Sequence, residues 1–461
     1  MKILNKNFVV FKMLAIGFIL AVLMIPSQMI SSLVDERQIR RDEATVEVNS
    51  KWGDNKYVVG PILVLPYKKI VNATDKKNIV EVVERAYFLP KSLNIDGELK
   101  PQILARGIYS IINYNGDLKF DGEYSQPDLE GLGISPASVI WKDAFVFAYI
   151  PDPKGLKEDI AFNWDSHKAK MDPGASIAMN LGEDIPMEKE ITYIGDNSQK
   201  TYNGVGVKVA LDPAGAKDRN YKYSFNLNLN GSSELNFIPL GDTTNVKVRS
   251  DWQTPSFDGA FLPSEREVND KGFSANWKIL NFNRNFPSSW KEGASLNFFE
   301  PKFGVKLMMP VDEYQKTSRS IKYSILLISL TFLIFFFVEV IEKRRIHPIQ
   351  YTLVGLALLL FFTLLLAISE HLSFNLAYLI ASLATIAMIT LYSKTIFKNL
   401  KLTLLQAGIL AMIYAFIFTI IQLQDYSLLM GSLGLFIILA VVMYISRKID
   451  WYGGEESEKG D

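Results

Sequence analysis

Four ionisable residues stand inside or beside strongly apolar stretches of the sequence: Glu339, Glu370, His371 and Asp425. Such side chains are costly in lipid, and where they occur they often hold a charge partner, relay protons or contact a substrate. Glu339 could serve as a relay, but Lys343 follows four residues later, and this spacing favours an ion pair on one helix face. The other three could form a polar cluster that contacts a substrate, lines a small cavity or docks a neighbouring domain. They could equally be exposed at the membrane interface.

The rest of the sequence offers little for catalysis. It has no cysteine and three histidines, and it lacks a P-loop, a nucleophile elbow and a dinucleotide-binding glycine motif. We therefore predict no catalytic residue, no metal site and no cofactor. Asp165, Ser166 and His167 are adjacent residues that cannot easily turn toward one another along a strand. They predict a polar loop in preference to a catalytic triad.

Five aromatic residues lie close together in the sequence: Trp252, Phe257, Phe261, Trp277 and Trp290. They could line a groove for a glycan or a lipid. Large aromatic side chains more often fill the core of a sheet, which is the interpretation that we favour.

Six apolar segments are long enough to place the ionisable residues in a membrane, because a helix needs about 20 apolar residues to cross it. They cover residues 9–30, 323–341, 351–368, 374–392, 404–423 and 426–445. Short loops separate the last five, which predicts one compact bundle of antiparallel neighbours. The first segment could be a signal peptide, but no small-residue cleavage site follows it, so we favour an uncleaved anchor.

The basic residues of the short loops predict a single orientation. They lie before residue 13, where the uninterrupted apolar stretch of the first segment begins, and after the second, fourth and sixth segments: Lys2, Lys6, Lys12, Lys343, Arg344, Arg345, Lys394, Lys398, Lys401, Arg447 and Lys448. The loops around residues 370–371 and 422–425 have no lysine or arginine. Since short loops rich in positive charge lie on the cytoplasmic side, we expect both termini in the cytoplasm and residues 31–322 on the outer side of the membrane.

Residues 31–322 show the alternation of apolar and polar residues that is typical of half-buried strands. In one stretch Tyr221, Tyr223, Phe225, Leu227 and Leu229 alternate with polar residues. Turn dipeptides at short intervals favour antiparallel pairing, as in a β-sandwich. The charged residues 35–47 predict an exposed helix before the first strand, near residues 57–65.

The predicted fold is thus an α+β membrane protein with six transmembrane helices, arranged as one plus five. Its parts are a cytoplasmic N terminus with the first helix (1–30), an antiparallel β-rich, sandwich-like extracytoplasmic domain (31–322), a five-helix bundle (323–446) and a disordered cytoplasmic tail (447–461). The formal net charge is +0 and the isoelectric point is near 6.9, which argues against a nucleic-acid partner. The lipid bilayer is the first expected partner.

Several runs of residues resemble the CreD family of bacterial inner-membrane proteins. The resemblance covers nearly the whole chain and is strongest after residue 317, in Ser318-Arg319-Ser320-Ile321-Lys322-Tyr323, His347-Pro348-Ile349-Gln350-Tyr351, Ser369-Glu370-His371, Ala377-Tyr378-Leu379-Ile380-Ala381 and Asp450-Trp451-Tyr452. Earlier matches are Gly60-Pro61, Arg106-Gly107-Ile108-Tyr109, Pro255-Ser256-Phe257-Asp258-Gly259 and Gly272-Phe273-Ser274-Ala275-Asn276-Trp277. The acidic, glycine-rich tail after Tyr452 departs from the family pattern.

This resemblance implies an inner-membrane protein of cell-envelope maintenance or stress response, linked to a two-component regulatory system. It implies no catalytic residues. Our leading hypothesis is a non-enzymatic protein whose periplasmic domain binds a periplasmic protein or an envelope component. The alternative is a membrane enzyme or transporter that acts at the periplasmic face of the bundle through Glu370, His371 and Asp425. The sequence leaves the ligand and the oligomeric state open.

Overall fold

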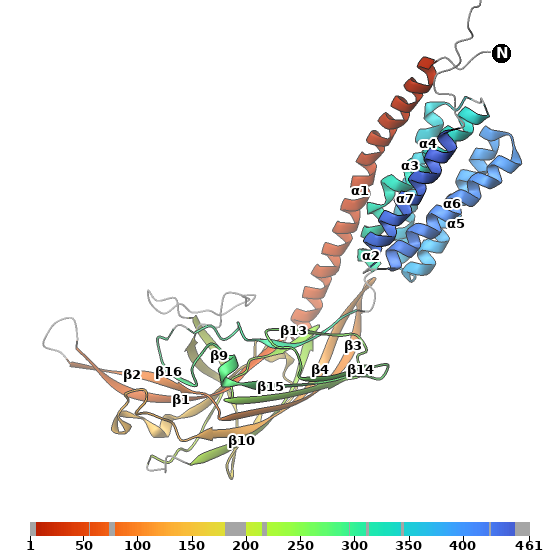
Figure 1. Cartoon of the computed structure of the whole chain (residues 1–461). Coiled ribbons are helices and arrows are strands. Elements are labelled where there is room, and N and C mark those ends of the chain that lie inside the picture. The colour runs from red at the N-terminus through yellow and green to blue at the C-terminus, as the bar shows by residue number, and fades with distance from the viewer. Residues whose placement is uncertain are drawn as a thin grey trace, which may run out of the picture. The chain divides into compact units, whose positions relative to one another are not determined.

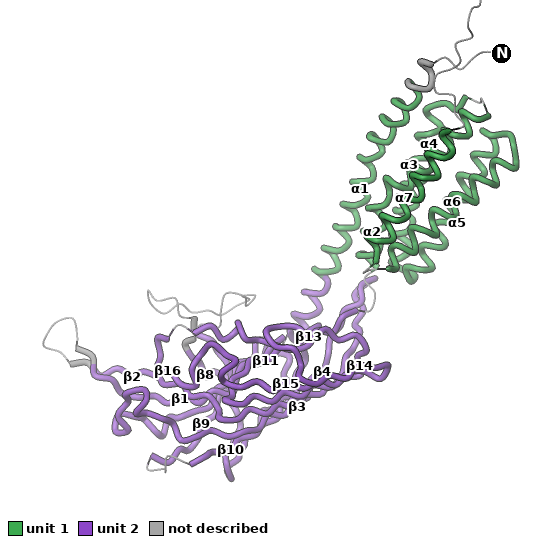
Figure 2. Tube along the Cα trace, viewed as in Figure 1, with its two compact units in different colours: residues 1–43, 311–461 green, residues 44–310 purple. Residues whose placement is uncertain are grey.

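The computed structural model describes residues 6–54, 56–72, 79–179, 200–213, 219–294, 296–309, 313–342, 345–423 and 426–447. The chain forms two compact units (Figure 2). Unit 1 comprises Met1–Glu43 and Val311–Asp461, and unit 2 comprises Ala44–Pro310. Two residues of the sequence analysis, Lys343 and Asp425, lie outside the described residues.

The N-terminal helix α1 is one continuous element of 47 residues, Lys6–Trp52 (Figure 1). Its apolar first part belongs to unit 1, and its last residues, from Ala44 onward, belong to unit 2. The predicted helix over residues 35–47 is therefore confirmed as a direct continuation of the first membrane segment.

Besides the first part of α1, the described residues of unit 1 form six helices: α2 (Glu313–Lys322), α3 (Ser324–Ile341), α4 (Pro348–Ser369), α5 (Phe374–Phe397), α6 (Leu400–Gln422) and α7 (Ser427–Ser446). Six of the described helices are long and apolar enough to cross a membrane, namely α1 and α3 to α7, which confirms the predicted set.

Local side-chain and backbone interactions determine where these helices begin. Pro348 begins α4 after the N-cap His347, and the Asn399 side chain accepts a hydrogen bond from Lys401 N at the start of α6.

The core of unit 1 is centred on α4, which packs against its neighbours through large side chains. The Phe361 ring lies 5.3 Å from that of Tyr378 and 4.8 Å from that of Tyr414. Small residues assist this packing, because Ala377 and Ala381 are fully buried. Not every small residue is a packing contact, since Gly408 and Gly431 have no described atom within 4 Å of the position that a Cβ would take.

Besides the end of α1, the described part of unit 2 consists of strands with short 3-10 turns between them. The strands are β1 (Tyr57–Asn72), β2 (Ile79–Phe88), β3 (Ser92–Arg106), β4 (Tyr109–Ser125), β5 (Phe145–Tyr149), β6 (Ala161–Trp164), β7 (His167–Lys170), β8 (Asp172–Met179), β9 (Lys200–Lys208), β10 (Asn220–Ser232), β11 (Glu234–Phe237), β12 (Thr243–Ser250), β13 (Pro255–Gly259), β14 (Glu265–Asn269), β15 (Gly272–Leu280), β16 (Ser289–Lys291) and β17 (Phe303–Leu307).

These strands form two sheets. The first has nine strands, with the path β13-β17-β11-β1-β5-β9-β8 and with β2 joining β1 to β16. The second has eight, in the order β14-β15-β12-β3-β4-β10-β6-β7. One hydrophobic core contains residues from both sheets, such as Leu63 and Phe147 from the first and Phe120 and Phe225 from the second. Most pairs are antiparallel as predicted, but β1 runs parallel to β11 and β12 runs parallel to β3, so the domain is mixed.

The aromatic residues of the sequence analysis belong to this core. Trp277 is 2% exposed and Trp290 is 5% exposed, while Trp252, Phe257 and Phe261 pack against the core from its edge. The core interpretation is thus correct. The predicted polar loop is confirmed for Asp165 and Ser166, which form the exposed turn between β6 and β7, whereas His167 is the first residue of β7 and pairs with Trp164.

Candidate functional site

Glu339 forms a buried ion pair with Lys12 of α1. The Lys12 Nζ lies 3.1 Å from Glu339 Oε1, and the two side chains are 7% and 3% exposed. An isolated charge in such a place would be strongly unfavourable, so each of these residues depends on the other. The pair joins α1 to the C-terminal end of α3.

Two further groups complete the surroundings of the Glu339 carboxylate. Tyr351 donates its hydroxyl to Oε2 over 2.9 Å, and the backbone N–H of Ile346 donates to Oε1 over 3.1 Å. Lys12 also donates to the carbonyl oxygen of Ile346, and its Nζ lies 4.9 Å from the centroid of the Tyr351 ring. We call Lys12, Glu339, Ile346 and Tyr351 the inner cluster.

The loop between α3 and α4 makes this cluster possible. The chain turns back after Ile341, and Pro348 starts α4 so that Tyr351 lies in the first turn of that helix. The local partner suggested by the sequence, Lys343, lies outside the described residues, while the contact that the structure does describe comes from α1. With both oxygens of Glu339 occupied, the arrangement suits a fixed structural link better than a mobile proton carrier.

At the opposite end of the bundle, Glu370 caps the C terminus of α4 and faces α1 and α2. Its Oε1 lies 3.6 Å from Arg37 Nε and accepts a hydrogen bond of 3.3 Å from the Tyr314 hydroxyl. The Glu370 side chain is 11% exposed and that of Arg37 is 35% exposed. Arg41 lies over the Tyr314 ring at 5.6 Å. We call Arg37, Glu370 and Tyr314 the outer cluster.

The sequence predicts Glu370, His371 and Asp425 together at this end of the bundle, but the structure does not give them one common environment. Glu370 is engaged by α1 and α2, the neighbouring His371 is exposed, and Asp425 lies outside the described residues. A second set of polar contacts lies at the same helix ends. Lys316 donates to Gln422 over 3.1 Å, and Gln422 in turn donates to Asn375.

Between the two clusters, both polar and apolar side chains of α1 contact the bundle. The hydroxyls of Ser27 and Ser324 are 2.8 Å apart, and Leu23 approaches Gly355 so closely that a Cβ there would lie 2.3 Å from its Cδ1. Val34 is 1% exposed. Partly buried apolar residues of α1 also pack against the core of unit 1, namely Ile16, Ile19, Leu20, Ile30 and Leu33.

Within unit 2, the last turns of α1 are held by the second sheet. Arg106 donates to both oxygens of Glu47, at 2.8 and 3.1 Å. The buried Asn113 donates to Asn49 over 3.2 Å. The Asn230 side chain donates to the carbonyl of Trp52 over 3.0 Å. The helix therefore has specific partners in each unit.

Unit 2 also contains a buried cation, Arg284. Its guanidinium donates to the carbonyls of Pro239 and Leu240, and its Nη2 lies 3.2 Å from Asp242 Oδ1. Burial lowers the pKa of Arg284 to about 10, against the opposing effect of Asp242. All these contacts join parts of the sheet core, so we assign Arg284 to the stability of the domain.

Two comparisons with known proteins agree with each other. A family model described as "Inner membrane protein CreD" matches residues 8–452. The "Inner membrane protein CreD" of Escherichia coli strain K12 is 29% identical over 450 residues, which cover 97% of this chain and 94% of that protein. The match thus includes both units and all four residues of the inner cluster.

Proposed function

The chain belongs to the CreD family of inner membrane proteins, and from that premise we propose that it is a non-enzymatic protein of envelope maintenance or stress response. In this proposal unit 2 lies in the periplasm and binds a periplasmic protein or an envelope component. Unit 1 anchors the chain in the membrane, and α1 transmits a change of state in unit 2 to unit 1.

The observation that carries this proposal is the way α1 is held. One helix has specific side-chain partners in unit 1, through Lys12 and Arg37, and in unit 2, through Glu47 and Asn49. A helix that only anchored a domain would need apolar contact with lipid and no such partners. Polar contacts with defined geometry at several positions along α1 would allow a conformational change in one unit to be transmitted to the other.

The proposed orientation can be tested because the chain has no cysteine. A single cysteine placed at Phe282, which is 92% exposed in unit 2, should react with a membrane-impermeant maleimide in intact spheroplasts. A cysteine at the exposed Lys401 of α6 should react only after permeabilisation. The reverse result would overturn the orientation.

The coupling through α1 can be tested with Arg106→Ala, which removes the contact to Glu47. We expect this variant to accumulate normally and to lose complementation of a deletion strain in an envelope-permeability assay. Arg219→Ala is the matched control, because Arg219 forms a similarly exposed ion pair, to Asp212, away from α1. Equal complementation by both variants would contradict a role for the α1 contact.

Binding by unit 2 can be tested by in vivo crosslinking from a photoreactive residue at Phe282, followed by identification of the captured molecule. Turnover of peptidoglycan or of lipid-linked substrates by the purified full-length protein would instead support the enzyme alternative. Replacing Glu370 or His371 with Ala or Asn provides a second test of that alternative. Variants with unchanged envelope sensitivity would remove its proposed site.

A further inference from the structure

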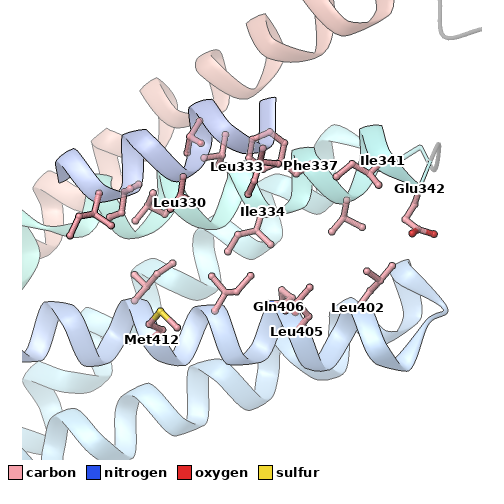
Figure 3. Close-up of a pocket in the computed structure, with 18 residues that line it drawn as sticks. Leu330, Leu333, Ile334, Phe337, Ile341, Glu342, Leu402, Leu405, Gln406 and Met412 are labelled. Carbon is pink, nitrogen blue, oxygen red and sulfur yellow. The ribbon is translucent and has the colours of Figure 1, made fainter. Parts of the chain in front are cut away.

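Two of the cavities in the described structure differ in what they could bind. The cavity in unit 1 lies between α3, α6 and α7, and almost all of the side chains that line it are apolar (Figure 3). The amide of its residue Gln406 is buried, so apolar chains are sufficient to cover this cavity. The cavity in unit 2 has a volume of about 590 Å³, and its lining combines apolar rings with carboxylates. This volume falls within the range of about 300–1,000 Å³ that is usual for small-molecule sites.

The cavity in unit 2 is formed mainly by the segment between β4 and β5, residues 126–144. Leu129 and Val139 of this segment are 7% and 8% exposed and belong to the core of the unit. The backbone N–H of Ile140 donates to the carbonyl oxygen of Pro66 in β1 over 2.9 Å. The core and the sheet therefore hold the walls of the cavity in place, and little ordering is needed when a ligand binds.

Trp141 and three prolines supply the apolar rings of this cavity. The prolines are Pro127 and Pro136 of the same segment and Pro213, which follows β9. The Trp141 side chain packs against the core but stays partly exposed. Its Nε1 donates to the carbonyl oxygen of Pro136 over 3.2 Å, which fixes the indole ring. Among aromatic side chains, tryptophan attracts a cation most strongly to the face of its ring.

The side-chain donors of the lining are already in use. The Gln126 Nε2 donates to the carbonyl oxygen of Asp212 over 3.0 Å, and its Oε1 accepts the Tyr221 hydroxyl over 2.7 Å. The indole N–H of Trp141 is bonded to a proline carbonyl. Proline and leucine side chains have no donor. A ligand in this cavity therefore finds no free side-chain donor among the residues that line it.

The acceptors of the lining belong to two exposed carboxylates, Asp128 and Glu130, and no lysine or arginine lines the cavity. The backbone N–H of Gly131 donates to Asp128 Oδ1 over 3.1 Å, which orients that group. A carboxylate has about four acceptor sites, so both groups can accept further hydrogen bonds. Such a lining suits a ligand group that donates and does not accept. The lysine ammonium and the arginine guanidinium are groups of this kind, whereas sugar hydroxyls do both.

The apolar rings favour a cation that is carried on a stem. Lysine and arginine pack their methylene groups along apolar surface while the charged end stays in a polar environment. At about 30 Å³ for a group the size of a water molecule, the cavity holds roughly 20 such groups. One basic residue with one neighbouring residue is of this size.

We propose that this cavity binds a segment of a partner protein that contains a lysine or an arginine. The basic group donates to Asp128 and Glu130, while its stem and an adjacent apolar residue pack on Trp141 and the prolines. This inference rests on the proposed function, in which unit 2 binds a periplasmic partner. It adds the site on unit 2 and the charge of the partner segment.

The test uses the full-length protein in phosphatidylcholine nanodiscs. The probe is the acetylated peptide Ala-Leu-Lys-Ala with a photoreactive leucine, and the crosslinked positions are mapped by mass spectrometry. We expect labelling within residues 126–141, which added salt should reduce because the carboxylates are exposed. A probe with norleucine in place of lysine keeps the stem and loses the charge. It should label this segment about fivefold less.

Variants separate recognition by the cavity from a general attraction to acids. Asp128→Asn with Glu130→Gln should lower labelling about fivefold, and both side chains are exposed, so the fold should be unaffected. The matched control is Glu265→Gln with Glu267→Gln, because these two exposed acids have the same spacing on β14 and lie outside the cavity. The control should leave labelling unchanged. Trp141→Ala should lower it about fivefold as well.

Three results would overturn the inference. Equal labelling by the norleucine peptide would mean that the cavity does not recognise a charge. Competition by spermidine as strong as that by the unlabelled peptide would assign the cavity to free amines. Competition of that strength by the disaccharide diacetylchitobiose would assign it to glycans.

The inference and the proposed function can fail separately. Crosslinking from Phe282 in vivo identifies a partner of unit 2 wherever that partner binds. If the double variant of Asp128 and Glu130 left this capture unchanged, the partner would bind elsewhere on unit 2. The proposed function would then stand without the cavity as its site.

Discussion

The two ion pairs that join α1 to the bundle differ mainly in their exposure. In the inner cluster, Lys12 and Glu339 are 7% and 3% exposed. In the outer cluster, Arg37 and Glu370 are 35% and 11% exposed. The inner carboxylate accepts two hydrogen bonds besides its ion pair, whereas the described bond to the outer one is a single longer contact from Tyr314. Similar charges at the two ends of one helix are therefore expected to have unequal roles.

The difference indicates which end of α1 is fixed and which can move. A buried pair cannot open without leaving charges in an apolar medium, so the inner cluster should act as an anchor. A partly exposed pair exchanges its contact for water at little cost, so the outer cluster can release α1. This difference agrees with the proposal that α1 transmits a change in unit 2 to unit 1. The weaker ion pair is the one nearer to unit 2 along the chain.

The largest expected effect comes from removing the inner carboxylate. Glu339→Ala leaves Lys12 buried without a counter-charge, and we expect the free energy of unfolding to fall by about 3–5 kcal/mol. Unfolding of the full-length protein by dodecyl sulfate in mixed micelles would measure it. Glu342→Ala, three residues later and exposed, is the matched control. If both variants were equally stable, the inner cluster would not be an anchor.

The double variant Lys12→Met with Glu339→Leu tests whether the loss arises from an unpaired charge. Apolar residues of similar size often replace a buried ion pair with little loss of stability. We expect the double variant to be more stable than Glu339→Ala. A double variant as unstable as the single one would point to a loss of shape, and not to an uncompensated charge.

The second effect compares the tyrosines of the two clusters. Tyr351→Phe removes a hydrogen bond to a buried carboxylate and should cost about 1.5–3 kcal/mol of unfolding free energy. Tyr314→Phe removes the longer bond to Glu370 and should cost less than about 1 kcal/mol. The same titration measures both variants. Equal costs would remove the difference that we draw between the two ends of α1.

The third effect concerns the middle of α1. Gly355→Leu places a side chain where Leu23 and the Phe332 ring now lie, and overpacking of this kind costs about 1–3 kcal/mol. The reduced contact should appear as lower disulfide crosslinking between cysteines introduced on α1 and α4. Adding Leu23→Ala should restore part of the loss. Without such rescue, the close approach of these helices would not be what holds α1 in place.

The smallest effect is expected at the outer carboxylate. Glu370→Gln should change the free energy of unfolding by less than about 1 kcal/mol, because Arg37 is partly exposed. Added salt should shrink this difference but leave that of Glu339→Ala unchanged, since buried pairs are screened much less. A large, salt-independent effect at Glu370 would reverse our assignment of the anchored end.

The membrane helices could be predicted because their signal is local. A run of about 20 apolar residues is sufficient to define a span, and each predicted segment corresponds to a helix. Alternation within β10 likewise predicted buried residues such as Tyr221 and Phe225. The parallel pairs β1·β11 and β3·β12 could not be predicted, because parallel and antiparallel strands share the same period of two residues.

Only Glu339 of the inner cluster could be identified from the sequence as a candidate site residue. Glu339 stood out because an acid in an apolar segment is rare, but its partner was sought within the same helix, where spacing rules apply. Lys12 is on another helix and lies among basic residues that also report orientation, so nothing local links it to Glu339. Nothing in the sequence marks Tyr351 or Arg37 as a partner of a carboxylate. Their contacts with Glu339 and Glu370 form only when the helices pack together.

The continuity of α1 gives its contacts a fixed phase. Lys12, Leu23 and Val34 follow one another at intervals of eleven residues, a repeat that returns to almost the same angle after about three turns of a straight helix. Arg37 falls on the same side. Deleting one residue between Leu23 and Val34 would turn Val34 and Arg37 by about 100° relative to Lys12 and Leu23. These residues could then no longer all face their partners in unit 1, whereas an insertion of eleven residues would keep their common face. Within unit 1, the contacts of α1 therefore depend on the number of residues between them as well as on the residue types.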